Sequence, residues 1–156
     1  MQSRTLGSRG QTYQSLKRYE EALKDFDRAI ELNSEYSGAI SCRAQTYKYL
    51  KRYEEALKDF DRAIELDNDY AWASGNRGQI YQFLGQFESS LQDFDRAIEL
   101  EPEDCEWDLY LRSLTLIKLD RPTEAQTDIQ TAIALAQAKQ AQEPIDWQNN
   151  FNLALY

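Results

Sequence analysis

Apolar and small side chains recur along this chain at the three- and four-residue spacing of amphipathic helices. One run includes Leu6, Gly10 and Tyr13, and the next includes Leu23 and Phe26. This spacing places such residues on one helix face, so each run predicts a helix with one buried side. The runs are separated by short breaks, which predicts pairs of helices joined by tight turns. Asn, Asp and Pro mark the breaks between pairs, and Gly85 and Pro122 mark two of the breaks within pairs. These breaks fall at 16–18, 33–36, 50–52, 67–70, 84–86, 101–105 and 119–122.

The pattern is periodic over most of the chain. The segment RYEEALKDFDRAIEL occupies residues 18–32 and again 52–66, a shift of 34, and a degraded copy follows at 86–100. A fourth, more divergent copy comes one residue late, and we place the extra residue in the loop 101–105. One helix pair cannot bury its apolar side alone, so the pairs must stack into an array. The array is predicted over residues 1–136, with units at approximately 3–36, 37–70, 71–105 and 106–136.

The end of the chain departs from the period. Residues 128–142 continue as a long helix rich in Ala and Gln, and Pro144 breaks it. Asp146 then suits the N-cap of a last helix. Residues 137–156 are therefore predicted as an extended helix end, a break and a C-terminal capping helix. Because the chain stops on an apolar run at Tyr156, we expect it to be a fragment of a larger regulatory protein.

The repeated positions resemble the tetratricopeptide repeat (TPR), as it occurs in bacterial-type arrays. That family places Gly, Tyr, Ala, Phe and Ala at fixed offsets within a 34-residue unit. The first unit supplies them as Gly10, Tyr13, Ala22, Phe26 and Ala29. The resemblance implies an all-α fold, a right-handed superhelical solenoid of antiparallel helix pairs, with about four units plus the C-terminal capping helix.

Composition narrows the chemistry. The net charge of −9 argues against a binder of nucleic acid, which needs a basic stripe along the phosphate backbone. The absence of His removes the usual general base and zinc ligand, and Cys42 and Cys105 lack metal-site spacing. No stretch has the length or apolarity of a signal peptide or membrane span. We expect a cytoplasmic protein with reduced cysteines, no cofactor, no metal, no membrane partner and no enzymatic activity.

One charged pattern departs from the family, which usually has Leu where this chain has Arg. Each of these arginines is followed sixteen residues later by an aspartate. We interpret this offset as a structural ion pair, either between the two helices of a unit or across the junction to the next; solvated, independent charges are the alternative. The pairs are Arg9 with Asp25, Arg43 with Asp59, Arg77 with Asp93, and Arg112 with Asp128.

In the resembling family the first helices of the units line a concave groove. Gln11, Gln45 and Gln79 form a ladder there that is suited to the backbone of an extended peptide, and Gly7, Ser41 and Gly75 leave room for its approach. The glutamines could equally face water, and the aromatic residues could pack on the preceding turn. The carboxylate clamp of chaperone-binding relatives is absent, because its lysine positions hold the small residues. The candidate groove residues are Gln11, Gln45, Lys48, Tyr49, Trp72, Gln79, Gln82, Phe83, Trp107 and Tyr110.

These features favour a non-enzymatic protein–protein interaction scaffold that binds a partner peptide or helix in the concave groove. The alternative is a structural self-association module, a weak homo-oligomer that stacks through the exposed ends of the array.

Overall fold

Eight α-helices follow one another in the computed structural model, which describes residues 2–142. Every predicted break within this range falls between two of them, and α8 begins at Pro122 as expected for a helix-opening proline. The predicted break and capping helix at 143–156 lie outside the described residues. The helices are α1 (Gln2–Ser15), α2 (Tyr19–Leu32), α3 (Ser37–Tyr49), α4 (Tyr53–Leu66), α5 (Ala71–Phe83), α6 (Phe87–Leu100), α7 (Glu106–Lys118) and α8 (Pro122–Gln142).

The turn inside each pair contains one residue with left-handed backbone. Gly85 has φ 74°, which fits the tight turn predicted there, whereas the matching positions hold Lys17, Lys51 and Asp120 with φ near 59°. The turn also satisfies carbonyl groups that the helix leaves unpaired. The N–H of Arg18, for example, donates to the carbonyl of Tyr13 at 2.8 Å.

Small residues let the two helices of a pair approach closely. Ala22 and Ala29 are fully buried in α2, and the ring of Phe26 fills the space between them and α1. A Cβ placed on Gly10 would lie 2.7 Å from that ring, so only glycine fits the present spacing. Phe60 and Phe94 occupy the same buried place in the following units. The repeated small and large positions therefore build one continuous core.

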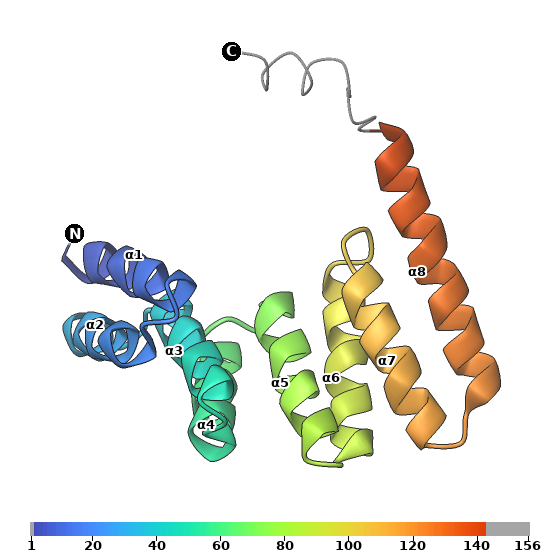
Figure 1. Ribbon diagram of the computed structural model, residues 1–156, viewed down its shortest axis with the longest axis horizontal. Coiled ribbons are helices and arrows are strands. Elements are labelled where there is room, and N and C mark those ends of the chain that lie inside the picture. The colour runs from blue at the N-terminus through green and yellow to red at the C-terminus, as the bar shows by residue number, and fades with distance from the viewer. Residues whose placement is uncertain (1, 143–156) are drawn as a thin grey trace.

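The helix pairs stack side by side along the long axis of the molecule (Figure 1). Each first helix approaches the first helix of the next unit, from α1 to α7, to within 8 Å between Cα atoms, whereas no two second helices among residues 2–142 come that close. The first helices are thus packed more closely than the second helices, which bends the stack. The first helices line the concave side, and the second helices form the convex side.

Helix α8 is longer than the other second helices and, running antiparallel to α7, extends past the first residue of α7 (Figure 1). Lys139, on this extension, donates to Asp104 at 2.6 Å and to Glu106 at 2.9 Å. These contacts fasten the extension to the start of α7. On its outer side, Ile129 and Ile133 are exposed, because no further helix pair follows them within the described residues.

Candidate binding groove

The structure places each of the four arginines against the aspartate sixteen residues later. Arg43 donates through Nε and Nη2 to the two carboxylate oxygens of Asp59, at 2.7 and 2.8 Å. Such a two-bonded contact fixes the direction as well as the distance between the two helices of a unit. The other pairs have the same geometry, with distances of 2.6–2.8 Å, in Arg9–Asp25, Arg77–Asp93 and Arg112–Asp128.

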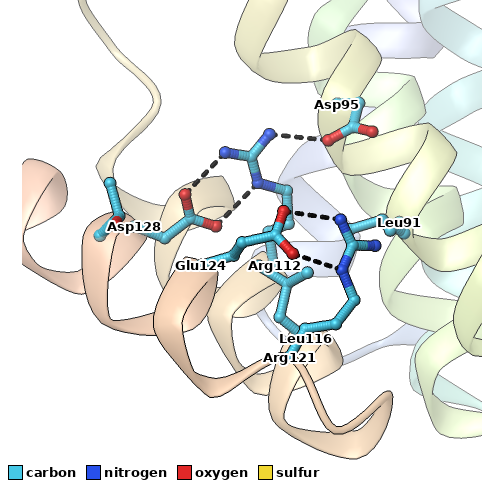
Figure 2. A pocket seen from close by; sticks show the side chains of 8 residues that line it. Leu91, Asp95, Arg112, Leu116, Arg121, Glu124 and Asp128 are labelled. Atoms are coloured by element: carbon cyan, nitrogen blue, oxygen red, sulfur yellow. Dashed lines mark hydrogen bonds and ion pairs between the residues drawn. The ribbon is translucent and has the colours of Figure 1, made fainter.

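The remaining guanidinium nitrogen reaches back to the preceding unit. Nη1 donates at 2.7 Å to an aspartate of the previous second helix in Arg43–Asp27, Arg77–Asp61 and Arg112–Asp95. Figure 2 shows Arg112 between Asp128 and Asp95, beside the exposed pair of Arg121 and Glu124. The hollow of about 350 Å³ beside them is lined by charges that already have partners. This network therefore serves the stack, and it leaves no free charge for a ligand.

The shared carboxylates keep these guanidinium groups charged. Burial alone lowers the pKa of Arg43, but the hydrogen bonds that Arg43 donates to Asp59 and Asp27 outweigh it and raise the pKa above its ordinary value. For Arg77 and Arg112 the hydrogen bond to Asp93 or Asp128 has the largest effect, and the pKa is again raised. These three guanidinium groups therefore stay protonated near neutral pH.

A hollow of about 590 Å³ opens between α3, α5 and α7, the first helices of the second, third and fourth units. We call it the central hollow. It continues past Gln45 and Tyr49 into a second hollow of about 400 Å³ beside the turn between α1 and α2. Together they form a groove along the concave side. The central hollow is lined by Gln45, Lys48, Tyr49, Trp72, Gly75, Asn76, Gln79, Glu101, Asp104, Trp107 and Asp108.

Six of the ten predicted groove residues line the central hollow, and four do not. Gln82 is turned into the array, where its amide donates to Leu111 O at 3.0 Å and to Thr115 Oγ1 at 2.9 Å. Gln11 donates to the thiol of Cys42 at 3.2 Å. Phe83 and Tyr110 are exposed, but they lie outside the hollow.

The three glutamines of the predicted ladder differ in whether their side chains already make hydrogen bonds. Gln45 has no hydrogen-bond partner within residues 2–142, whereas the side-chain oxygen of Gln79 accepts a bond of 3.1 Å from Lys48. Gln11 is engaged by Cys42. One glutamine of the three thus has its full side-chain amide available to a peptide backbone.

The aromatic residues both pack within the array and remain accessible. Tyr49 stacks on Tyr19 with ring centres 5.5 Å apart, and Trp72 stacks on Tyr70 at 5.8 Å. Trp107 lies 5.4 Å from Tyr110 and is 61% exposed. These contacts hold the rings in place while leaving part of each ring open to the groove. Phe83 pairs with Tyr53 at 5.4 Å in the same way, outside the central hollow.

At the first two junctions between units, tyrosine side chains fill the space that was expected to be free beside the small groove residues. A Cβ on Gly7 would lie 3.1 Å from the ring of Tyr36, and the hydroxyl groups of Ser41 and Tyr70 are 3.0 Å apart. The small residues therefore admit the tyrosine at the end of the loop between two units instead of a ligand. The expectation of free space at these two positions was wrong, because Tyr36 and Tyr70 fill that space.

The third junction is built differently. Where the earlier junctions carry Tyr36 and Tyr70, this one has Cys105, a buried free thiol that donates to the carbonyl of Pro102. No phenol ring fills the space above Gly75. The carboxylate of Asp108 lies there instead, so close that a Cβ on Gly75 would be 2.5 Å from its Oδ1. The central hollow lies at the junction that lacks its tyrosine.

Two charged groups of the hollow have shifted pKa values. Lys48 donates to Asn76 Oδ1 at 2.6 Å and to Gln79 Oε1 at 3.1 Å, and burial lowers its pKa to about 8. Burial, with a smaller contribution from the charge of Glu101, raises the pKa of Asp108 to about 6. Lys48 is held by neutral amides, and no ion pair joins it to Asp108 in the described part of the chain.

The sequence reasoning did not single out Asn76, Asp108 or the loop acids Glu101 and Asp104. A signal was present for Asp108, because the matching positions in the earlier units hold Thr5, Ala39 and Ala73. A carboxylate in a place otherwise held by small residues is a departure from the repeat. Asn76 likewise stands where the second unit has Cys42.

The described residues also bear on the expectations for the cysteines, for a membrane span and for a metal site. Both Cys42 and Cys105 are buried and free, as expected for reduced thiols. No helix among residues 2–142 combines the length and the apolar character that crossing a bilayer requires. In the same range, no group of three or more Cys, Asp or Glu side chains is placed to hold a metal ion.

Several solved structures share this fold. MamA from Desulfovibrio magneticus RS-1, residues 41 to the end, superposes with a TM-score of 0.78 at 19% identity, covering 87% of this chain and 76% of that one. The first TPR of Spaghetti (RPAP3), bound to HSP90 peptide SRMEEVD, gives a TM-score of 0.65 at 23% identity, covering 88% of this chain and 92% of that one. The second TPR of Spaghetti, bound to the same peptide, gives 0.63 at 33% identity, covering 65% and 94%.

The family profile adds sequence evidence to this likeness. No curated protein sequence matches the chain significantly. The profile described as tetratricopeptide repeat, however, matches residues 3–36 and, in a second form, residues 37–103. These matches span the first three units, whose Gly, Tyr, Ala and Phe positions build the observed core. The chain belongs to the tetratricopeptide repeat family.

Proposed function

We propose that this chain is a non-enzymatic interaction module whose concave groove holds an extended peptide or a helix of a partner protein. The observation that carries the proposal is the row of fixed but accessible rings along the central hollow, namely Tyr49, Trp72 and Trp107. Large aromatic residues with restrained side chains supply much of the binding energy at protein interfaces. Their packing against Tyr19, Tyr70 and Tyr110 reduces the entropy lost on binding.

The related structures support the same reading. Both TPR domains of Spaghetti hold a peptide of a partner protein. The present groove has its own chemistry, since Gly7, Ser41 and Gly75 replace the lysines of a terminal-carboxylate clamp. The proposed partner is therefore a peptide or helix of a different protein.

The groove is tested by selecting binders from a displayed peptide library on the purified chain and measuring the affinity of a selected peptide by calorimetry. Replacing Tyr49 and Trp72 together by Ala is expected to weaken binding at least about 30-fold, which corresponds to roughly 2 kcal/mol. Leu84→Ala is the matched control, because Leu84 is an exposed apolar residue outside the hollow. Equal affinity of the double variant and the control would exclude the groove as the binding surface.

Self-association is a second candidate, favoured by the exposed end of the array. Ile129 and Ile133 stand where Phe26 and Ile30 of the first unit are covered by the next helix pair. A second copy docking head to tail would bury them, and such stacking does not close on itself. Sedimentation across a concentration series tests this candidate. Association that disappears in Ile133→Glu supports it, and a monomer at all concentrations excludes it.

A further inference from the structure

Asp108 is a half-buried carboxylate whose charge has no partner in the described structure. Asp108 is the third residue of α7, and its carboxylate lies against Gly75 on α5. Within residues 2–142 it has neither a hydrogen-bond donor nor a cation at ion-pair distance. This contrasts with the stack, where Asp25, Asp59, Asp93 and Asp128 each accept two bonds from an arginine. A buried charge normally has such a partner, because desolvation without one costs free energy.

The charges around Asp108 do not supply that partner. Glu101 is close enough to raise the pKa of Asp108 further, and Asp104 is already bound by Lys139 at 2.6 Å. Lys48, the one cation among the lining residues, is bonded to Asn76 and Gln79. The α7 side of the central hollow is therefore negatively charged. The net charge of −9 adds a long-range attraction for basic partners.

Two aromatic rings line the same hollow as this negative charge. Trp72 lies on α5, three residues before Gly75, and Trp107 directly precedes Asp108 on α7. Both indoles are partly exposed and line the same hollow as Asp108. The face of an indole attracts a cation, and the planar guanidinium group of arginine also stacks on it. A hollow lined by a carboxylate and by tryptophans offers what a basic side chain needs, an anion for its charged head and an apolar surface for its stem.

We propose that the central hollow binds an arginine or lysine side chain of a basic partner peptide, with Asp108 and Glu101 as its countercharges and Trp72 and Trp107 as its walls. This inference rests on the proposed function, and it names the chemistry of the partner. Arginine fits better than lysine, because its fork can meet two carboxylate oxygens while its plane stacks on a ring. An acidic partner residue held by Lys48 is the competing outcome of the test.

The probes are short blocked peptides that differ only at a central residue, which is arginine, citrulline or glutamate. Citrulline keeps the shape of arginine and removes its charge. Binding is followed by tryptophan fluorescence and by calorimetry at low salt. The arginine peptide is expected to bind at least about tenfold more tightly than the citrulline peptide, and the glutamate peptide more weakly than both. Raising the salt concentration should reduce only the advantage of arginine.

Two variants separate the charges. Asp108→Asn keeps the shape of the side chain, and it should bring the affinity for the arginine peptide down to that for the citrulline peptide. Leu84→Ala, which lies outside the hollow, is the matched control and should leave the affinity for the arginine peptide unchanged. Lys48→Met removes the cation that would hold an acidic partner residue. Thermal melts of all these variants verify that the array remains folded. Tighter binding of the glutamate peptide, lost in Lys48→Met, would overturn the proposal in favour of an acidic partner.

The test also separates this inference from the proposed function. If the peptides selected from the library depend on Trp72 but contain no enrichment of basic residues, the groove stands and the basic partner is refuted. If the wild-type chain selects no peptide at all, both are refuted. Enrichment of arginine that is lost when the library is screened on Asp108→Asn supports both.

Discussion

The Nη1 of Arg43 lies 2.7 Å from the Oδ1 of Asp27, and this contact joins the second helix pair to the first. The same guanidinium group also holds Asp59 within its own unit. Among residues 2–142, Arg9, at the start of the array, has only the ion pair within its unit, to Asp25. Its side chain is 58% exposed, against 19% for Arg43. The two arginines therefore differ in burial and by one inter-unit contact.

Arg43→Leu is expected to destabilise the array by about 3–5 kcal/mol, because it leaves the buried carboxylate of Asp59 without a partner. Arg9→Leu should cost less, since water reaches that guanidinium group and no second unit depends on it. Asp27→Asn should cost no more than about 1 kcal/mol, because the Asp27 side chain is half exposed. The measurement is chemical denaturation followed by circular dichroism.

Replacing Arg43 and Asp59 together by Leu provides the control. This double variant removes both charges, so it should recover most of the stability lost in Arg43→Leu. If the double variant is as unstable as the sum of the single variants, the loss comes from packing and not from the unpaired carboxylate.

The repeated part of the molecule is visible in the sequence, and the central hollow is not. The helix pairs and the Arg–Asp offset recur in every unit, so the sequence contains the pattern of the same contact four times. Asp108 and Cys105 occur once, and their effect depends on Gly75 and on tyrosines of other junctions that meet them only in three dimensions. The double role of the arginines was also left open, since an offset does not tell whether one guanidinium group serves two units.

The left-handed turn residues predict where stability can be gained. Lys51 adopts φ 59°, a conformation that costs a residue with a Cβ about 1 kcal/mol, whereas Gly85 adopts φ 74° in the matching turn without that cost. Lys51→Gly is therefore expected to stabilise the array by up to about 1 kcal/mol, and Gly85→Ala to destabilise it by a similar amount. Opposite shifts of the thermal midpoint would agree with this reason. A loss of stability in Lys51→Gly would contradict it.

The aromatic core position predicts a difference between the middle and the end of the array. Phe94 is fully buried, so Phe94→Ala should create a cavity and cost about 3–5 kcal/mol. Ile129 holds the same place in the last unit and is 37% exposed, so Ile129→Ala should cost only about 1 kcal/mol. Urea denaturation of the two variants makes the comparison. Equal costs would mean that Ile129 is covered in solution.

Asp108 gives the stability a defined pH dependence. Its pKa is raised from the ordinary value of 3.8 to about 6, so the folded chain binds a proton more strongly than the unfolded chain. Between about pH 4 and pH 6 the folded state therefore holds more protons, and this residue lowers the stability as the pH rises. Above about pH 6 the destabilisation is complete. Glu101, Asp104 and Lys48 also line the hollow; the pKa of Lys48 is about 8, so that group titrates at higher pH.

Asp108→Asn removes this destabilisation, so the variant should be more stable than the wild-type chain by about 1 kcal/mol at pH 7. This gain is smaller than the pKa shift alone would give, because solvent screens the partly exposed carboxylate. The gain should vanish near pH 4, where Asp108 is protonated in the folded chain and becomes so in the unfolded chain. Urea denaturation of both proteins from pH 4 to pH 8 measures the difference between their free energies of unfolding. The titration of the other acids largely cancels in this difference. Glu101→Gln is the companion variant and should move the window to lower pH, because it removes the charge that repels Asp108. A stability difference that stays constant over this range, or that grows toward acidic pH, would show that the Asp108 carboxylate is not destabilised by its surroundings.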